Sequence, residues 1–96
     1  MDNRIYLINL YDYYSDLLTQ KQREYFEDYY FDNLSLAEIS ENNNISRNAI
    51  HKQLKETEIK LENYEQKLQL YEKSIKIKDL VKDLDKDLQE KIKELI

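Results

Sequence analysis

Residues 35–54 read SLAEISENNNISRNAIHKQL, and this stretch decides the fold. A short segment with apolar periodicity is followed by three consecutive asparagines at 42–44, and a second amphipathic segment starts after Ser46. Asparagine hydrogen-bonds to nearby backbone and tolerates the left-handed region, so the triplet predicts a turn. Two helices joined by such a short turn, with the small Ser40 in the first and Ile45 as an apolar plug before the second, predict a helix-turn-helix motif.

Hydroxyl side chains mark where the helices are expected to begin. Thr19 with Gln22, and Ser35 with Glu38, have the spacing of a capping box, in which two side chains satisfy backbone donors reciprocally. Ser46 is expected to cap the second helix of the motif. Together with the apolar periodicity, these caps predict helices over 4–18, 20–32, 36–42 and from 47 onward.

The helix that begins at residue 47 carries the candidate binding residues. Arginine and lysine pair with guanine edges or phosphates and asparagine pairs with adenine, while Ile50 and Leu54 on the opposite face hold the helix to the core. The alternative, an ordinary solvated face, stays open. Neither a second histidine nor a cysteine is present, so no metal site is predicted. The predicted nucleic-acid-binding residues are Arg47, Asn48, His51, Lys52 and Lys55.

Apolar side chains continue along this helix with alternating spacings of four and three residues, interrupted only by Thr57. We expect one continuous helix of about 28 residues, roughly 42 Å long, which is too long for a compact domain to cover entirely. Three partners stay open for this seam: the first two helices folding back, the C-terminal helix, or a second copy in a homodimer. The predicted partner seam consists of Leu61, Tyr64, Leu68 and Tyr71.

The C-terminal part is expected to form a separate helix. Between Ser74 and Asp79 lysines cluster, and Asp79 can cap a new helix, so a break is predicted there. The chain is therefore divided into a helical domain at 1–75, with the helix-turn-helix at 35–55, and an amphipathic helix at 76–96. The apolar stripe of that last helix is Leu80, Leu84, Leu88, Ile92 and Leu95.

Composition narrows the class of protein. The 96 residues fit one domain and include no glycine, proline or cysteine. Helices joined by polar connections are therefore favoured, and turns with positive φ have to use asparagine or aspartate. Disulfides, thiolate catalysis and thiolate zinc sites are excluded. Because no catalytic constellation or glycine-rich phosphate loop is present, we expect no enzyme activity and no cofactor.

Charge and hydropathy indicate where the protein can act. No window approaches the roughly 18 uninterrupted apolar residues of a spanning helix, so we expect a soluble, cytoplasmic protein without membrane contact. Residues 1–45 hold three basic and nine acidic side chains, whereas residues 46–96 hold twelve and eleven. Phosphate neutralisation supplies most non-specific nucleic-acid affinity. The net charge of −5 therefore counts against avid binding, and any polyanion is expected to meet the second half.

The stretch from Tyr11 to Lys73 resembles the YlxM-like family, small helix-turn-helix proteins of Gram-positive bacteria and mollicutes. The resemblance rests on LLTQKQREYFEDYY at 17–30, on SLAEIS and ISRNAI, and on LENYEQKLQLYEK at 61–73. It implies an all-α fold similar to sigma-70 region 4, to which the apolar periodicity described above adds a long fourth helix and a C-terminal helix; the segment after Ile77 matches the family poorly. In that motif the turn residue is usually glycine and an apolar residue precedes it; here they are Asn44 and Asn43, which predicts a looser elbow.

The resemblance also implies a function. Members of the family are encoded beside the protein subunit of the signal recognition particle, which implies a role in that targeting pathway or its regulation. One hypothesis is a regulator that uses residues 47–55 on DNA or on the RNA of the particle. The other is an interaction module that binds the targeting GTPase or RNA polymerase through its acidic first half and heptad helix, steered by complementary charge. Function resides in the site and not in the fold, so both stay open.

Overall fold

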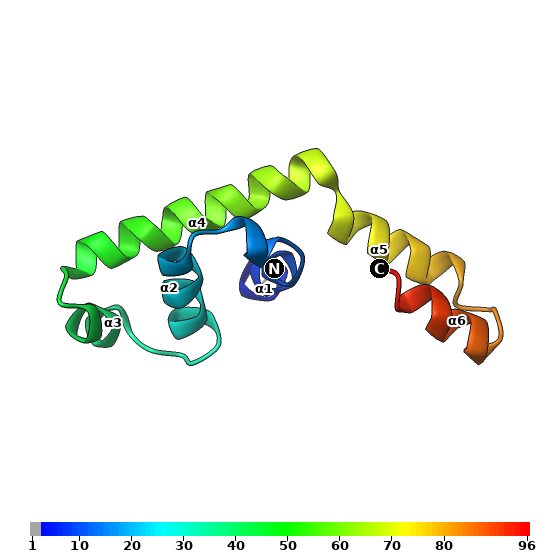
Figure 1. Ribbon diagram of the computed structural model, residues 1–96, viewed down its shortest axis with the longest axis horizontal. Helices are drawn as coiled ribbons and strands as arrows, with labels where there is room; N and C mark the ends of the chain where they lie inside the picture. The colour runs from blue at the N-terminus through cyan, green and yellow to red at the C-terminus, as the bar shows by residue number, and fades with distance from the viewer. Residues whose placement is uncertain (1–2) are drawn as a thin grey trace.

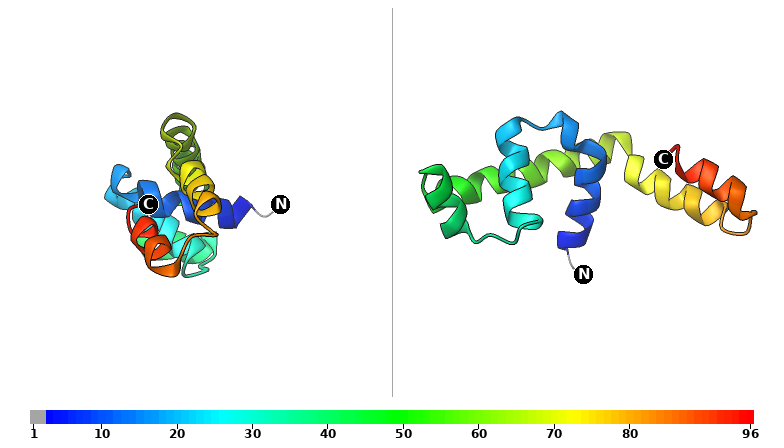
Figure 2. Two further views of the ribbon diagram at one scale, coloured as in Figure 1. Left: turned by 90° about the vertical axis from the view of Figure 1, so that its right-hand side faces the viewer. Right: turned by 60° about the horizontal axis from the view of Figure 1, so that its bottom comes forward.

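The computed structural model describes residues 3–96, and in that range the chain is all-α, as predicted. The longest helix, α4, runs along the molecule; α1, α2 and α3 pack against it, and a hairpin of α5 and α6 extends beyond its C-terminal end (Figures 1 and 2). The molecule is elongated, measuring 52 × 26 × 25 Å. The elements are α1 (Asn3–Tyr14), a 3₁₀ turn (Ser15–Leu17), α2 (Gln20–Tyr30), α3 (Leu36–Asn43), α4 (Arg47–Leu68), α5 (Leu70–Leu80) and α6 (Lys86–Lys93).

The predicted caps are confirmed. Thr19 accepts a hydrogen bond from the Gln22 amide at 3.2 Å, and the Gln22 side chain accepts one from the Thr19 amide at 3.0 Å. Ser35 and Glu38 form the same capping box, with distances of 3.1 and 3.0 Å. The Ser46 hydroxyl accepts from the third residue of α4 at 3.1 Å. These local bonds satisfy backbone donors that have no partner inside the helix, and so fix where α2, α3 and α4 start.

The asparagine triplet ends α3 and turns the chain into α4. Asn44 adopts the left-handed conformation, with φ 54°. The amide of Ile45 donates to the Ser40 carbonyl at 3.2 Å, which is the six-to-one bond of a Schellman motif, and the Ser40 hydroxyl donates to the Ile45 carbonyl. Asn43, at the predicted loose elbow, donates its side-chain amide to the Ile39 carbonyl at 2.8 Å. Ile45 leaves 37% of its surface exposed, so it plugs the turn less completely than predicted.

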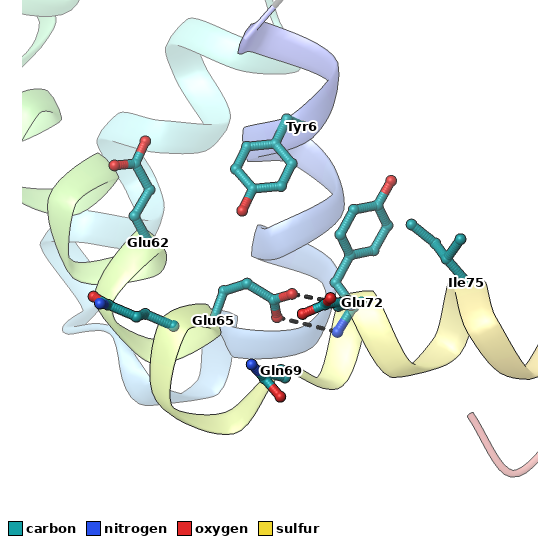
Figure 3. Close-up of a pocket in the computed structure, with 8 residues that line it drawn as sticks. Tyr6, Glu62, Glu65, Gln69, Glu72 and Ile75 are labelled. Atoms are coloured by element: carbon teal, nitrogen blue, oxygen red, sulfur yellow. Dashed lines mark hydrogen bonds between the residues drawn. The ribbon is translucent and has the colours of Figure 1, made fainter.

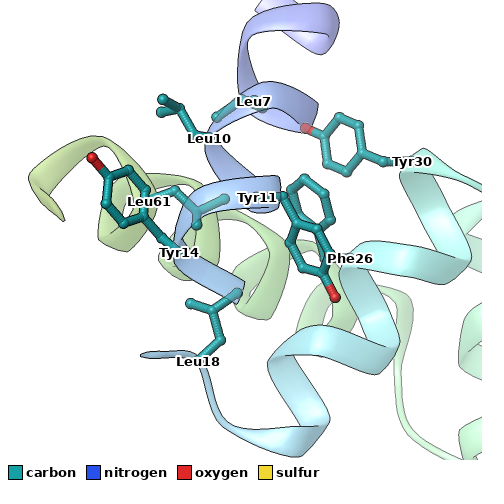
Figure 4. Packing of buried hydrophobic residues seen from close by; sticks show 8 residues of the cluster. All are labelled: Leu7, Leu10, Tyr11, Tyr14, Leu18, Phe26, Tyr30 and Leu61. Atoms are coloured by element: carbon teal, nitrogen blue, oxygen red, sulfur yellow. The ribbon is translucent and has the colours of Figure 1, made fainter. Parts of the chain in front are cut away.

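Two hydrophobic clusters hold these helices on α4. The larger one joins α1 and α2 to Leu61 of α4, and tyrosines supply much of it (Figure 4). Within it, Tyr11 and Phe26 stack with ring centroids 4.5 Å apart and planes 3° apart, an arrangement that adds to the area they bury. The smaller cluster lies under the helix-turn-helix and consists of Tyr25, Ile39, Ile50 and Leu54.

The predicted continuous helix through residue 75 is wrong, because α4 ends at Leu68. Gln69 takes the left-handed conformation, with φ 55°, and α5 leaves in a new direction. The side chain of Glu65 accepts hydrogen bonds from the amides of Tyr71 at 3.1 Å and Glu72 at 2.9 Å, and so caps α5. The buried positions along α4 keep the predicted heptad spacing from Ile50 through Leu54 and Thr57 to Leu61, but the next buried residue is Glu65 and not Tyr64.

The predicted break between Ser74 and Asp79 is also wrong, since these residues lie inside α5. The chain turns later, at 81–85, and Asp85 caps α6 by accepting from the Leu88 amide at 3.0 Å. The segment 76–96 is therefore not one amphipathic helix. It comprises the end of α5, a turn and the short helix α6, which folds back beside α5 (Figure 2).

Candidate nucleic-acid interface

The first turns of α4 are held rigidly by the helices beneath them. Ile50 is fully buried and Leu54 nearly so, and both pack against Ile39 of α3 and Tyr25 of α2. With one face of α4 fixed in this way, the polar side chains of residues 47–55 lie on the other face. The caps described above set the helix start, so the position of each of these side chains follows from the sequence.

All five predicted binding residues are exposed. Arg47 and His51 are one turn apart, as are Asn48 and Lys52, so the five form two neighbouring rows on the helix surface. Within residues 3–96, neither Arg47 nor Lys52 forms an ion pair. Their charges are therefore available to a ligand. Arg47 also lies at the N-terminus of α4, where the unpaired amides and the helix dipole favour an anion.

His51 and Lys55 lie in a different setting from the other three. They line a cavity of about 230 Å³ between α4 and α2, together with Tyr30 and Glu58. The Lys55 ammonium is 3.6 Å from the Glu58 carboxylate, to which the Tyr30 hydroxyl donates at 2.7 Å. Burial, and then this bond to Glu58, raise the pKa of Tyr30. Part of the Lys55 charge is thus already offset inside the chain.

Exposed acidic side chains occur on both helices of the helix-turn-helix. No acid occurs between Ser46 and Lys55, but Glu56 follows immediately on α4, and Glu41 is exposed in the last turn of α3. The net result is a short basic segment on an otherwise acidic chain. A polyanion that approaches α4 from its N-terminal end meets Arg47 and Lys52 before Glu56. Long-range attraction is nevertheless weak, because the protein as a whole carries −5.

Three of the four predicted seam residues pack inside the chain. Leu61 is fully buried in the larger cluster against helices of its own chain, so it is not available to a second copy. Tyr64 packs against Tyr14, with ring centroids 5.9 Å apart, and Tyr71 packs edge-on against Tyr6, also at 5.9 Å. Among the partners left open, α1 folding back is the one observed. Leu68 differs from the other three and remains 45% exposed.

A buried carboxylate at the end of α4 was missed by the sequence reasoning. Glu65 lines a cavity of about 470 Å³ where α1, α4 and α5 meet, near Tyr6 and Glu62 (Figure 3). It also accepts a hydrogen bond from the Tyr14 hydroxyl at 2.5 Å. Its position four residues after Leu61 is the signal that could have found it, since that spacing keeps a side chain on the buried face.

The structure also bears on two other classes of site, metal centres and membrane spans. Across residues 3–96, no group of three or more histidine, cysteine or acidic side chains is arranged to hold a metal ion. None of the helices in that range combines the length and the apolar character needed to cross a lipid bilayer.

Comparison with known proteins gives a consistent result. All 96 residues match the family model described as "Putative helix-turn-helix protein, YlxM / p13 like". A UPF0122 protein of Shouchella clausii is 47% identical over 73 residues, covering 76% of this chain and 67% of the relative. UPF0122 proteins of Oceanobacillus iheyensis and Anoxybacillus flavithermus are each 53% identical over 64 residues, covering 67% of this chain. These two matches span only 61% and 58% of the relatives' own length.

Proposed function

The chain belongs to the YlxM/p13-like family of helix-turn-helix proteins, and from this premise we propose that it is a regulator that binds nucleic acid through the first two turns of α4. The observation that carries the proposal is the exposure of Arg47, Asn48 and Lys52 on a helix face whose opposite side is locked into the core. We further propose that it acts in the cytoplasm, in the signal recognition particle pathway that the family resemblance implies. Its target is then DNA or the RNA of the particle.

The three exposed side chains are suited to different contacts with a nucleic acid. Arg47 and Lys52 carry charges that no ion pair within residues 3–96 offsets, about one and a half turns apart, which suits contacts to phosphates. Asn48 lies between them, and its amide can pair with the edge of an adenine. In helix-turn-helix proteins the N-terminal residues of the second helix of the motif approach the bases while the first helix crosses the backbone. Here those two helices are α4 and α3.

The same surface predicts modest affinity and strong salt dependence. Each phosphate that is neutralised releases counterions, so the logarithm of the binding constant falls with the logarithm of salt by about 0.9 per contact on duplex DNA and about 0.7 on single strands. Arg47, Lys52 and a helix N-terminus support few such contacts. Glu56, one turn after Lys52 on α4, opposes binding. We expect affinities in the range of non-specific binders unless base contacts add to them.

A second candidate function rests on a different observation. The exposed surface of α1 to α3 and their connections is rich in carboxylates, and such a surface attracts a basic protein and raises its association rate. In this case the protein is an interaction module, and its partner is the targeting GTPase or RNA polymerase. We expect neither enzyme activity nor a cofactor in either case. The exposed carboxylates are Asp12, Asp16, Glu27, Asp32, Glu38 and Glu41.

A salt titration separates the two functions. Fluorescence anisotropy of labelled duplex DNA and of labelled particle RNA is measured at several salt concentrations, with the wild-type chain and with R47A/K52A. The matched control is K86A/K93A, which removes two lysines of α6 that form no ion pair within residues 3–96 and changes the net charge equally. Nucleic-acid binding through α4 predicts a lower salt slope for R47A/K52A and little change for the control. An equal slope for both variants, with binding to the GTPase retained, would favour the interaction module.

A further inference from the structure

The hairpin of α5 and α6 exposes large aliphatic side chains to an unusual degree. Leu80 is 80% exposed and Leu95 is 85% exposed. Leu84 and Leu88 add partly exposed surface along the same hairpin. Single exposed leucines need no explanation, but several of them on one small element mark a surface for a partner.

A groove accompanies these side chains. A cavity of about 420 Å³ opens between the C-terminal residues and α5, next to the end of α1. Its lining is mostly apolar and includes Tyr13, Leu70, Ile77 and Leu95. The hairpin thus offers both projecting leucines and a recess that can receive an apolar side chain. It lies at the opposite end of α4 from the helix-turn-helix (Figure 1).

The charge of the hairpin restricts what can bind there. Residues 70–96 carry seven basic and seven acidic side chains, whereas residues 1–69 carry eight and thirteen, and so hold the whole net charge of −5. Several charges within the hairpin are already paired with each other. The pairs are Lys76–Glu72 at 3.2 Å, Lys82–Asp79 at 3.3 Å and Lys91–Asp87 at 3.1 Å.

We propose that the α5–α6 hairpin is the surface through which two copies of this chain associate. A strongly charged protein or an anionic membrane gains no attraction from a neutral hairpin, whereas a second copy brings its own neutral apolar hairpin to the contact. Elsewhere the two copies repel each other, because each carries its excess of acids on residues 1–69. A two-fold axis sets the hairpin of one copy against the hairpin of the other. Both copies keep α3 and the start of α4 free.

Sedimentation equilibrium of the full chain over a wide concentration range tests this. The informative variant is L80K/L95K, which alters side chains that are almost fully exposed and leaves the packing of one chain intact. The matched control is I5K/I59K, which places two lysines at exposed isoleucines outside the hairpin and changes the net charge equally. Ile5 is 63% exposed and Ile59 is 56% exposed. A second variant, L80Q/L95Q, removes the apolar surface without adding charge. Circular dichroism checks that each variant keeps its helices.

We expect a reversible dimer for the wild-type chain and for I5K/I59K, with dissociation constants within about threefold of each other. L80K/L95K and L80Q/L95Q should raise the dissociation constant by at least about tenfold. A wild-type chain that stays monomeric up to about 1 mM would overturn the proposal. So would a dimer that survives both hairpin variants, or one that I5K/I59K weakens as much as L80K/L95K.

Discussion

Replacing Glu65 by alanine should loosen the junction between α4 and α5. Glu65 is 7% exposed and accepts three hydrogen bonds, from the Tyr14 hydroxyl at 2.5 Å and from the amides of Tyr71 and Glu72 at 3.1 and 2.9 Å. Tyr14 is fully buried, and its hydroxyl in turn accepts from the Leu70 amide at 3.1 Å. One carboxylate therefore connects α1, α4 and the first turn of α5.

The magnitude follows from these three bonds. A hydrogen bond to a charged group contributes about 1.5–3 kcal/mol, and loss of a helix cap costs about 0.5–2 kcal/mol. The effects are not additive, so we expect Glu65→Ala to lower the free energy of unfolding by about 3–5 kcal/mol. Glu65→Gln keeps one acceptor oxygen and should cost about 1–3 kcal/mol. Against a typical total of about 5–15 kcal/mol, the alanine variant is severely weakened.

Urea denaturation followed by circular dichroism measures the free energy, and hydrogen exchange at the Tyr71 and Glu72 amides reports on the cap itself. The control is Glu62→Ala, which removes an exposed carboxylate from the same helix and the same cavity and should change stability by less than about 0.5 kcal/mol. If Glu65→Ala cost less than about 1 kcal/mol, or left exchange at both amides unchanged, the cap would not stabilise the junction.

Three shorter predictions test other parts of the fold. Asn44→Gly should change the free energy of unfolding by less than about 0.5 kcal/mol, because glycine adopts the left-handed backbone of position 44 without strain. Asn44→Val should lower it by at least about 1–2 kcal/mol, because valine is strained there; equal urea midpoints for the two variants would contradict this. Leu61→Ala should cost about 2–5 kcal/mol independently of protein concentration, since α1 covers this side chain; a loss that depends on concentration would point to a dimer seam instead. Burial, aided by the bond to Glu65, raises the pKa of Tyr14 from 10.0 to about 12. The unfolded chain therefore loses this proton first, so stability should be complete below about pH 10 and fall as the pH rises toward 12. Unfolding free energies measured between pH 9 and 12 should fall less steeply for Tyr14→Phe, and a flat wild-type profile would refute the assignment.

The helix starts could be predicted because their chemistry is local. Thr19, Ser35 and Ser46 each bond to an amide three residues later, so sequence spacing alone contains the geometry. The turn at Asn44 is local in the same sense, because the side chain at that position decides whether a positive φ is tolerated. The expectation that positive φ falls on asparagine or aspartate in a chain without glycine also holds at Asn33, with φ 56°, but it is wrong at Gln69, with φ 55°.

The end of α4 could not be predicted in this way. Gln69 is not a usual helix breaker, and the bonds that stabilise the break come from Glu65 and from Tyr14, which lies 56 positions before Leu70. Once α1 packs on α4, this bonding makes the left-handed turn favourable. The prediction of a break between Ser74 and Asp79 was wrong for another reason. Asp79 and Asp85 are both suitable caps in similar lysine-rich contexts, so local chemistry does not distinguish them; Asp79 lies inside α5 and Asp85 caps α6.

Some features of the candidate interface could be predicted from sequence spacing, and others depend on how the helices pack. The exposure of Arg47, Asn48 and Lys52 follows from helical spacing once Ile50 and Leu54 are placed in the core. The pairing of Lys55 with Glu58 is partly readable from their spacing of three residues. The cavity that His51 shares with Tyr30 is not, because it depends on how α2 crosses α4.

Amide chemical-shift mapping tests the central claim most directly. The isotope-labelled chain is titrated with a short DNA duplex and with particle RNA at low salt, and the shifts are followed residue by residue. Binding through α4 predicts that the largest changes fall on residues 46–55, with smaller ones at the N-terminus of α3. Saturable changes confined to the α5–α6 hairpin, or none on residues 46–55 at any salt concentration, would contradict the proposed nucleic-acid interface.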